Sequence, residues 1–169
     1  DKDFTIYDTD DSKRVIKDVL KEKNLDEKTY PPRSVLAAIS HSKDQYESIE
    51  DFAKRAEAAN DWRMKDYAKI YAAYEKRLRT ANALDFDDII YHAVTLLRQE
   101  PEVLGYYQHK FRYVLVDEYQ DTNHLQYLLT SLLAGGYQNL CVVGDDDQSI
   151  YRFRGANIEN ILNFEQQYP

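Results

Sequence analysis

Apolar residues recur three and four positions apart through most of the first half of the chain, which is the period of a helix with one buried face. The pattern predicts four helices, which begin near Ser12, Pro32, Ser48 and Asp61. The fourth helix extends to about Arg79 and carries a stripe of tyrosines. Such a stripe could stack on nucleic-acid bases. We instead expect Tyr67, Tyr71 and Tyr74 to be core residues whose hydroxyls reach the surface.

The second half of the chain contains short apolar runs that end abruptly in polar residues. Tyr113 to Val116 is followed at once by Asp117 and Glu118, and Leu140 to Val143 stops at a glycine. Runs of this kind are typical of buried parallel strands that carry functional groups at their C-terminal ends. We therefore predict two neighbouring strands that end in one place, with Cys141 packed in the core.

Three aspartates lie between these two patterns. Asp85 and Asp88 have the spacing of a helix cap and its reciprocal partner, and Asp87 would add to a favourable first turn. A metal site is the alternative interpretation, but a capped first turn explains the three carboxylates more simply. The buried stripe of this helix is predicted to be Phe86, Ile89, Ile90, Val94 and Leu97.

Charge is distributed unevenly along the chain, whose net charge is −8. Residues 1–80 hold 17 acidic and 17 basic side chains, whereas residues 81–169 hold 13 and 5, which places a domain boundary near Thr80 to Leu84. The net charge has the wrong sign for bulk attraction to nucleic acid, so any DNA contact must be local or must need parts of a larger protein. Because no apolar run suits a membrane span or a signal peptide, we expect a cytoplasmic protein without a membrane partner.

Three strings resemble motifs of the UvrD/Rep/PcrA group of superfamily 1 DNA helicases. Asp117 to Asn123 reads Asp-Glu-Tyr-Gln-Asp-Thr-Asn and resembles motif II, a Walker B-like element. Gly144 to Ala156 reads Gly-Asp-Asp-Asp-Gln-Ser-Ile-Tyr-Arg-Phe-Arg-Gly-Ala and resembles motif III. Leu84 to Asp88 resembles a further signature of the group. The resemblance extends from about Phe4 onward and is closest in the second half.

The resemblance implies an α/β fold dominated by helices. It would combine a partial RecA-like P-loop NTPase domain, with parallel strands and flanking helices, and an all-α inserted subdomain. Residues 1–10 would be a short strand and linker of the motor domain, 11–80 the inserted subdomain, and 81–169 the C-terminal part of the first motor domain. The candidate strand is Phe4 to Tyr7.

The resemblance also implies an ATP-dependent helicase that translocates 3′ to 5′ on single-stranded DNA, with ATP and Mg²⁺ as cofactors. Asp117 is placed to hold Mg²⁺ through water, and Glu118 to orient and deprotonate the attacking water. Gln148 would sense the γ-phosphate through its amide, which gives it both a catalytic and a nucleotide-binding role. A surface acidic turn is the alternative for the two carboxylates, but the rest of motif II favours a nucleotide site.

Aromatic and basic residues alternate at the end of the motif III string, a pattern that suits single-stranded nucleic acid. By resemblance, Tyr151 and Phe153 stack on bases and Arg154 contacts the DNA backbone, with single strands and single-strand/double-strand junctions as partners. The group commonly has tryptophan where Phe153 stands, so stacking there should be weaker. A helicase-nuclease of the AddA/RecB type and a non-enzymatic helical interaction module are the alternatives.

The chain contains no G-x-x-x-x-G-K-[ST] phosphate-binding loop, so we expect it to be an inactive fragment when isolated. In the implied fold, the P-loop strand would flank Leu140 to Val143 on one side. Without that neighbour, the strand would keep an unpaired edge and favour self-association. Residues 81–169 would then be the less stable half.

Overall fold

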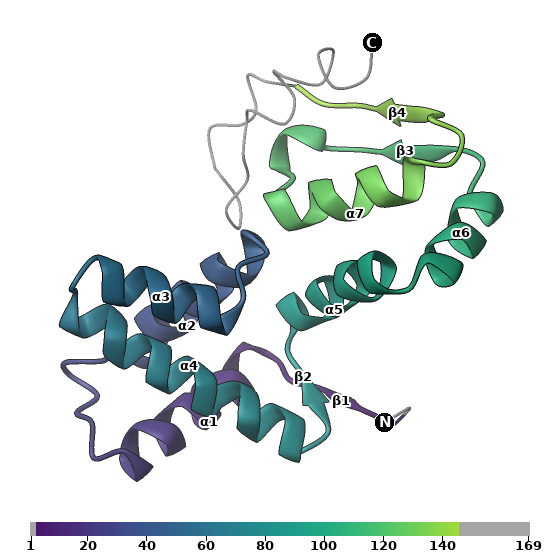
Figure 1. The fold of residues 1–169 in the computed structure, drawn as a ribbon. Coiled ribbons are helices and arrows are strands. Elements are labelled where there is room, and N and C mark those ends of the chain that lie inside the picture. The colour runs from purple at the N-terminus through teal and green to yellow at the C-terminus, as the bar shows by residue number, and fades with distance from the viewer. Residues whose placement is uncertain (1–2, 146–169) are drawn as a thin grey trace. The chain divides into compact units, whose positions relative to one another are not determined.

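The computed structural model describes residues 3–145 (Figure 1). The predicted functional residues Gln148, Tyr151, Phe153 and Arg154 lie outside this range. The chain divides into two compact units, Asp1–Ile89 and Ile90–Pro169. Helices account for most of the described residues and both sheets are small and parallel, which confirms a helix-dominated α/β fold.

The first unit is built mainly from four helices. They are α1 (Thr9–Glu22), α2 (Pro32–Asp44), α3 (Ile49–Ala58) and α4 (Trp62–Thr80). The predicted starts hold for the last three helices, and side-chain caps explain two of them: Ser48 accepts from the N–H of Asp51, and Asp61 accepts from the first turn of α4. Helix α1 begins three residues earlier than predicted because Asp8 forms a capping box with Asp11.

Helix α4 supplies much of the core of the first unit. Tyr67, Tyr71 and Tyr74 are all buried, which confirms the prediction that they are core residues. The expectation that their hydroxyls reach the surface is wrong for Tyr74, whose hydroxyl lies inside the unit and donates to Asp85. The other buried apolar residues of this core are Ile16, Val19, Leu20, Tyr30, Val35, Ile39, Phe52, Ala68, Ile70, Leu78 and Ala83.

A two-stranded parallel sheet joins the two ends of the first unit. Strand β1 (Thr5–Ile6) lies within the predicted strand segment and pairs with β2 (Ala83–Leu84). A two-residue strand has no periodicity, so β2 carried no signal in the sequence. Its pairing brings the residues just before α5 (Phe86–Gln99) back beside the start of the chain.

The second unit places helices and two parallel strands in alternation. Its elements are α6 (Pro101–Lys110), β3 (Val114–Val116), the 3-10 turn η1 (Tyr119–Asp121), α7 (His124–Ala134) and β4 (Leu140–Val142). Strands β3 and β4 pair in parallel, as predicted, and Val114, Leu115 and Val116 lie opposite Leu140, Cys141 and Val142.

The burial of these strands differs from the prediction. Helix α7 packs against β3, and alternate residues of a strand point to opposite faces. Val114 and Val116 are therefore half-buried, whereas Leu115 is 75% exposed and Cys141 is exposed as well. The expected core position of Cys141 is thus wrong for the described residues.

The predicted stripe of α5 is confirmed only in part. Val94 and Leu97 are buried, but Phe86 and Ile89 are exposed. Apolar packing therefore does not hold the first turn of this helix, and hydrogen bonds and ion pairs of Asp85 and Asp88 replace it. Within residues 3–145, no helix is both long and apolar enough to cross a membrane.

Candidate functional site

The C-terminal ends of β3 and β4 meet through backbone hydrogen bonds. The N–H of Val143 donates to the carbonyl of Val116 at 2.8 Å, and the N–H of Tyr119 donates to the carbonyl of Val143 at 2.9 Å. The residues that follow both strands are thereby brought to one edge of the sheet. This confirms the prediction that the two strands end in one place.

The predicted catalytic pair occupies the turn directly after β3. Asp117 and Glu118 are both exposed, and the N–H of Glu118 donates to Asp117 Oδ1 at 2.9 Å. Glu118 has a left-handed backbone with φ of 50° and ψ of 42°. Few non-glycine residues adopt this conformation, although Tyr46 and Gln138 also have a positive φ. The turn presents two carboxylates to solvent at the strand end.

Gln120 connects this turn to the loop that leaves β4. Its side chain is buried; Nε2 donates to Glu118 Oε2 at 2.7 Å, and Oε1 accepts from the N–H of Asp145 at 3.0 Å. One amide thus orients the Glu118 carboxylate and anchors the start of the segment that carries the motif III string. No separate role was predicted for this side chain, because a polar residue in a motif does not reveal its partners.

The rest of the motif II string supports the turn and starts the next helix. The hydroxyl of Thr122 donates to the carbonyl of Tyr119 at 2.7 Å. Asn123 and Gln126 form a capping box at α7, with reciprocal bonds of 2.9 and 3.0 Å between side chain and backbone. These residues stabilise the turn after β3 and the start of α7.

The donor set after β3 suits a hydrated magnesium ion. Mg²⁺ prefers oxygen ligands and is often held by one or two carboxylates through its waters. Asp117 and Glu118 supply such oxygens in an exposed turn. Of the residues assigned to ATP, Mg²⁺ and DNA, these two are the ones that the described structure brings together.

A second group of carboxylates surrounds a lysine in the first unit. Glu75, Asp85 and Asp88 offer oxygens that lie within 4.8 Å of one another, a geometry that could hold a metal ion. The cation among them is the ammonium of Lys43, which lies 2.6 to 2.8 Å from one oxygen of each. Asp85 and Asp88 also form the predicted reciprocal cap of α5, with N–H bonds of 2.8 and 3.0 Å. The cap is confirmed, and a lysine takes the position of a metal.

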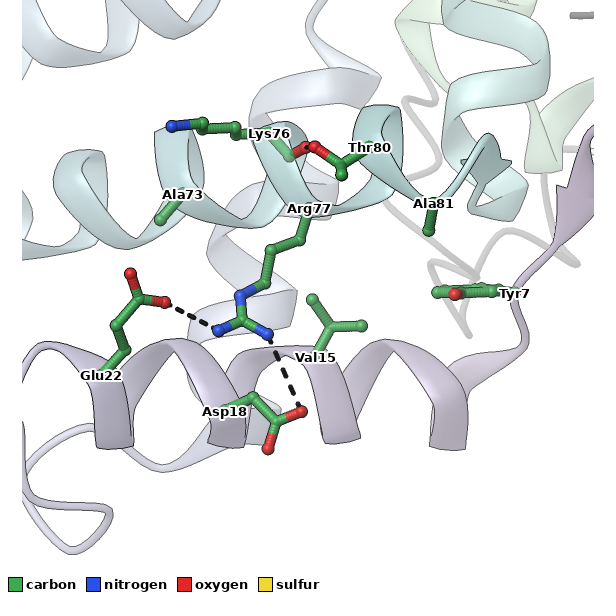
Figure 2. Close-up of a pocket in the computed structure, with 9 residues that line it drawn as sticks. All are labelled: Tyr7, Val15, Asp18, Glu22, Ala73, Lys76, Arg77, Thr80 and Ala81. Atoms are coloured by element: carbon green, nitrogen blue, oxygen red, sulfur yellow. Dashed lines mark hydrogen bonds and ion pairs between the residues drawn. The ribbon is translucent and has the colours of Figure 1, made fainter.

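A surface pocket lies between α1 and α4 (Figure 2). Arg77 extends across it toward α1, where it donates to Glu22 at 2.7 Å and lies 4.0 Å from Asp18. The hydrogen bond from Arg77 lowers the pKa of Glu22. Two carboxylates of α1 therefore satisfy the guanidinium of Arg77.

The chain is similar to helicases along its whole length. The family model of the UvrD/REP helicase N-terminal domain matches residues 1–169. A Staphylococcus epidermidis protein named ATP-dependent DNA helicase PcrA is 51% identical over 169 residues, which cover 100% of this chain and 23% of that protein. A Staphylococcus aureus protein of the same name is 50% identical with the same coverage. The chain therefore belongs to the UvrD/REP helicase N-terminal domain family and spans 23% of the length of these relatives.

Proposed function

We propose that this chain is part of an ATP-dependent DNA helicase and contributes groups that act on ATP and on single-stranded DNA. The turn after β3 is the observation that carries the proposal. There, Asp117 and Glu118 face solvent beside the loop that leaves β4, and Gln120 ties the two segments together. The name of the two relatives, which match the whole chain, supports the same activity.

The two carboxylates would have different roles. Asp117 uses Oδ1 for the N–H of Glu118, which leaves Oδ2 to accept from a water bound to Mg²⁺. Glu118 is oriented through Oε2 by Gln120, so Oε1 remains to accept the proton of the attacking water. When bound, Mg²⁺ would offset the charge that develops on the transferred phosphoryl group.

The remaining roles rest on the motif III string. Gln148 would report the presence of the γ-phosphate, while Tyr151 and Phe153 would stack on bases and Arg154 would bind the backbone of DNA. In the fold that this function requires, residues 1–10 and 81–169 belong to a RecA-like motor domain and residues 11–80 to an inserted helical subdomain. Movement would run 3′ to 5′. Unchanged single-strand affinity in Tyr151→Ala would contradict the stacking role.

The test is made on the full-length protein that contains this chain. Glu118→Gln should lower ATP turnover about 100-fold or more, because it removes the base and keeps the shape of the side chain. ATP affinity should stay near that of the parent, since the Asp117 carboxylate remains. Glu102→Gln, which changes an exposed glutamate of α6, is the matched control. Parental turnover in Glu118→Gln would refute the proposed role.

The isolated 169-residue chain should neither hydrolyse ATP nor unwind DNA, because it has no phosphate-binding loop. The measurement is ATP hydrolysis by the purified chain with and without single-stranded DNA. DNA-stimulated hydrolysis that is lost in Glu118→Gln would show that the chain is active alone.

We also propose that the isolated chain self-associates through β4. Among the described residues, β4 pairs with β3 alone, and Val143, directly after β4, is exposed. Sedimentation at increasing concentration should show oligomers, and Val143→Lys should reduce them because a charge beside the open edge opposes strand pairing. Phe4→Lys, at an exposed position in the first unit, is the control. A monomer at all concentrations would contradict the proposal.

A further inference from the structure

The side chain of Lys43 is buried at the end of α2, among acidic groups from two other parts of the first unit. The residue is 1% exposed, and Nζ lies 2.8 Å from Glu75 Oε1, 2.8 Å from Asp85 Oδ2 and 2.6 Å from Asp88 Oδ1. The same ammonium lies 5.5 Å from the centroid of the Tyr74 ring. We call Lys43, Tyr74, Glu75, Asp85 and Asp88 the Lys43 cluster. It joins α2, α4 and the start of α5.

Both aspartates of the cluster accept hydrogen bonds on each of their oxygens. Asp85 Oδ1 accepts from the N–H of Asp88, and Oδ2 accepts from Lys43 and from the Tyr74 hydroxyl. Asp88 Oδ1 accepts from Lys43, and Oδ2 accepts from the N–H of Asp85. Donors on every oxygen favour the ionised form of a carboxyl group, so both aspartates are suited to remain charged.

Glu75 differs from the two aspartates. Its Oε1 atom is buried and lies 2.8 Å from Nζ of Lys43, but within the described residues no backbone N–H reaches it, in contrast to the two aspartates. Burial raises the pKa of Glu75. Burial also raises the pKa of Asp88, whereas for Asp85 the attraction of Lys43 and the hydrogen bonds outweigh burial and lower the pKa. Hydrogen bonding thus selects Glu75 as the carboxyl group that is best suited to be neutral.

The net charge of the cluster also indicates that Glu75 is the residue that carries a proton. Three ionised carboxylates and one ammonium would leave two uncompensated negative charges in a buried site, which is costly. A proton on Glu75 would reduce the excess to one negative charge. That charge lies at the N-terminus of α5, where the helix dipole favours it. Burial lowers the pKa of Lys43, but its three carboxylate neighbours more than reverse this effect and keep the lysine charged.

We propose that the Lys43 cluster is a protonation-dependent lock on the first turn of α5, in which Lys43 is the resident cation and Glu75 carries a proton. The proposal is independent of the helicase function. It accounts for a helix start that apolar packing does not hold, since Phe86 and Ile89 are exposed. The chain passes from the first unit to the second within α5, so the lock fixes the segment that leads into the second unit.

The groups that face Glu75 determine how the lock responds to pH. They are Lys43 from α2, Asp85 and Asp88 from the start of α5, and Tyr74 on α4 itself, and α1 contributes the uncharged Ser12 next to the Tyr74 hydroxyl. A carboxyl group whose pKa is raised on folding stabilises the fold below its ordinary value, here 4.5, and this contribution is lost as the pH rises through the raised value. The first turn of α5 should therefore be held more stably in mild acid than in mild base.

Glu75→Gln in the 169-residue chain tests the proton directly, because glutamine is a neutral side chain of the same shape. At pH 8 the variant should melt several degrees higher than the parent, because its neutral side chain keeps the contribution that Glu75 loses with its proton, and this advantage should disappear toward pH 4.5. Asp85→Asn should instead lower the melting temperature at pH 8, and Glu27→Gln, at an exposed loop position, should change nothing. A loss in Glu75→Gln at pH 8 as large as that in Asp85→Asn would overturn the proposal.

A second measurement tests the role of Lys43 as the resident cation. Lys43→Ala should lower the melting temperature and leave three carboxylates whose oxygens are close enough to share one ion. Millimolar Ca²⁺ or Mn²⁺ should then raise the melting temperature by about 5 °C or more, which corresponds to a bound ligand in a domain of this size. Lys43→Ala/Asp88→Asn should not respond. If Lys43→Ala retained parental stability, or if it failed to respond to either ion, the lysine would not be the cation of the site.

Discussion

At the scale of single residues, the backbone of Glu118 is the unusual feature of the candidate site. A left-handed conformation costs a non-glycine residue about 1–2 kcal/mol, because its Cβ crowds the following carbonyl. The contacts that offset this cost are the bonds from Glu118 N–H to Asp117 and from Gln120 to Glu118 Oε2. The left-handed turn holds the Glu118 carboxylate at the strand end, as its proposed role of general base requires.

The strain can be measured by comparing two substitutions that both remove the carboxylate. Glu118→Gly should be more stable than Glu118→Ala by about 1 kcal/mol, because glycine adopts φ of 50° without a steric cost. Urea unfolding of both variants gives the difference. Since each variant loses the bond from Gln120, that loss cancels in the comparison. Equal stability of the two variants would show that the turn is not left-handed in solution.

At the scale of elements, α6 and α7 approach closely where α7 ends. The side-chain amide of Gln108 donates to the carbonyl of Leu132 at 2.8 Å, and thus satisfies one of the last carbonyls of α7. A Cβ atom added at Gly136 would lie 2.8 Å from Cβ of Gln108. Gly136 is therefore required for the close approach of the two helices.

Two alanine substitutions distinguish packing from helix propensity in this pair of helices. Gly136→Ala should cost about 1–3 kcal/mol, because neither the backbone nor a Cβ atom can move away easily. Gly105→Ala, inside α6 with open space around it, should gain about 1 kcal/mol through helix propensity. Thermal unfolding of the two variants is the measurement. A stabilised Gly136→Ala would mean that α6 and α7 do not pack as described.

At the scale of the whole chain, the described residues of the two units, 3–89 and 90–145, differ in how completely they are packed. The first unit has a contiguous core in which residues from α1, α2, α3 and α4 are almost fully buried. Among the described residues of the second unit, the buried apolar side chains are Val94, Leu97, Tyr119, Leu125 and Ala134. Because buried apolar area is the main source of stability, the second unit should be the weaker one.

The difference should appear as two separate unfolding transitions. Trp62 is the single tryptophan of the chain and lies in the first unit, where its ring meets Tyr30 edge-on. Its fluorescence should change at a higher urea concentration than the first loss of helical circular dichroism, which reports both units. Leu125→Ala should move the earlier transition to a lower urea concentration and leave the midpoint of the later transition unchanged. Coincident transitions would show that the units unfold together.

The sequence by itself determined most of the elements and the character of the candidate site. Helix periods, the helix starts near Ser48 and Asp61, the cap at Asp85, and the two strands that end in polar residues were all predictable, because each depends on neighbours within a few positions. The acidic pair at the end of β3 was predictable for the same reason. A parallel pair of strands must bring its C-terminal ends to one edge, so the meeting of the two loops followed from the strands.

Only the tertiary structure decided which distant groups meet and which faces stay open. Lys43 has the sequence context of a solvated lysine at a helix end, yet its partners Asp85 and Asp88 lie 42 and 45 positions away. Gln120 reaches the backbone of Asp145 across 25 positions. The exposure of Leu115 and Cys141 depends on what covers the second face of the sheet. An apolar run in the sequence does not show whether that face is covered. Burial and long-range pairing depend on how elements pack, whereas periodicity and capping are fixed within a single element.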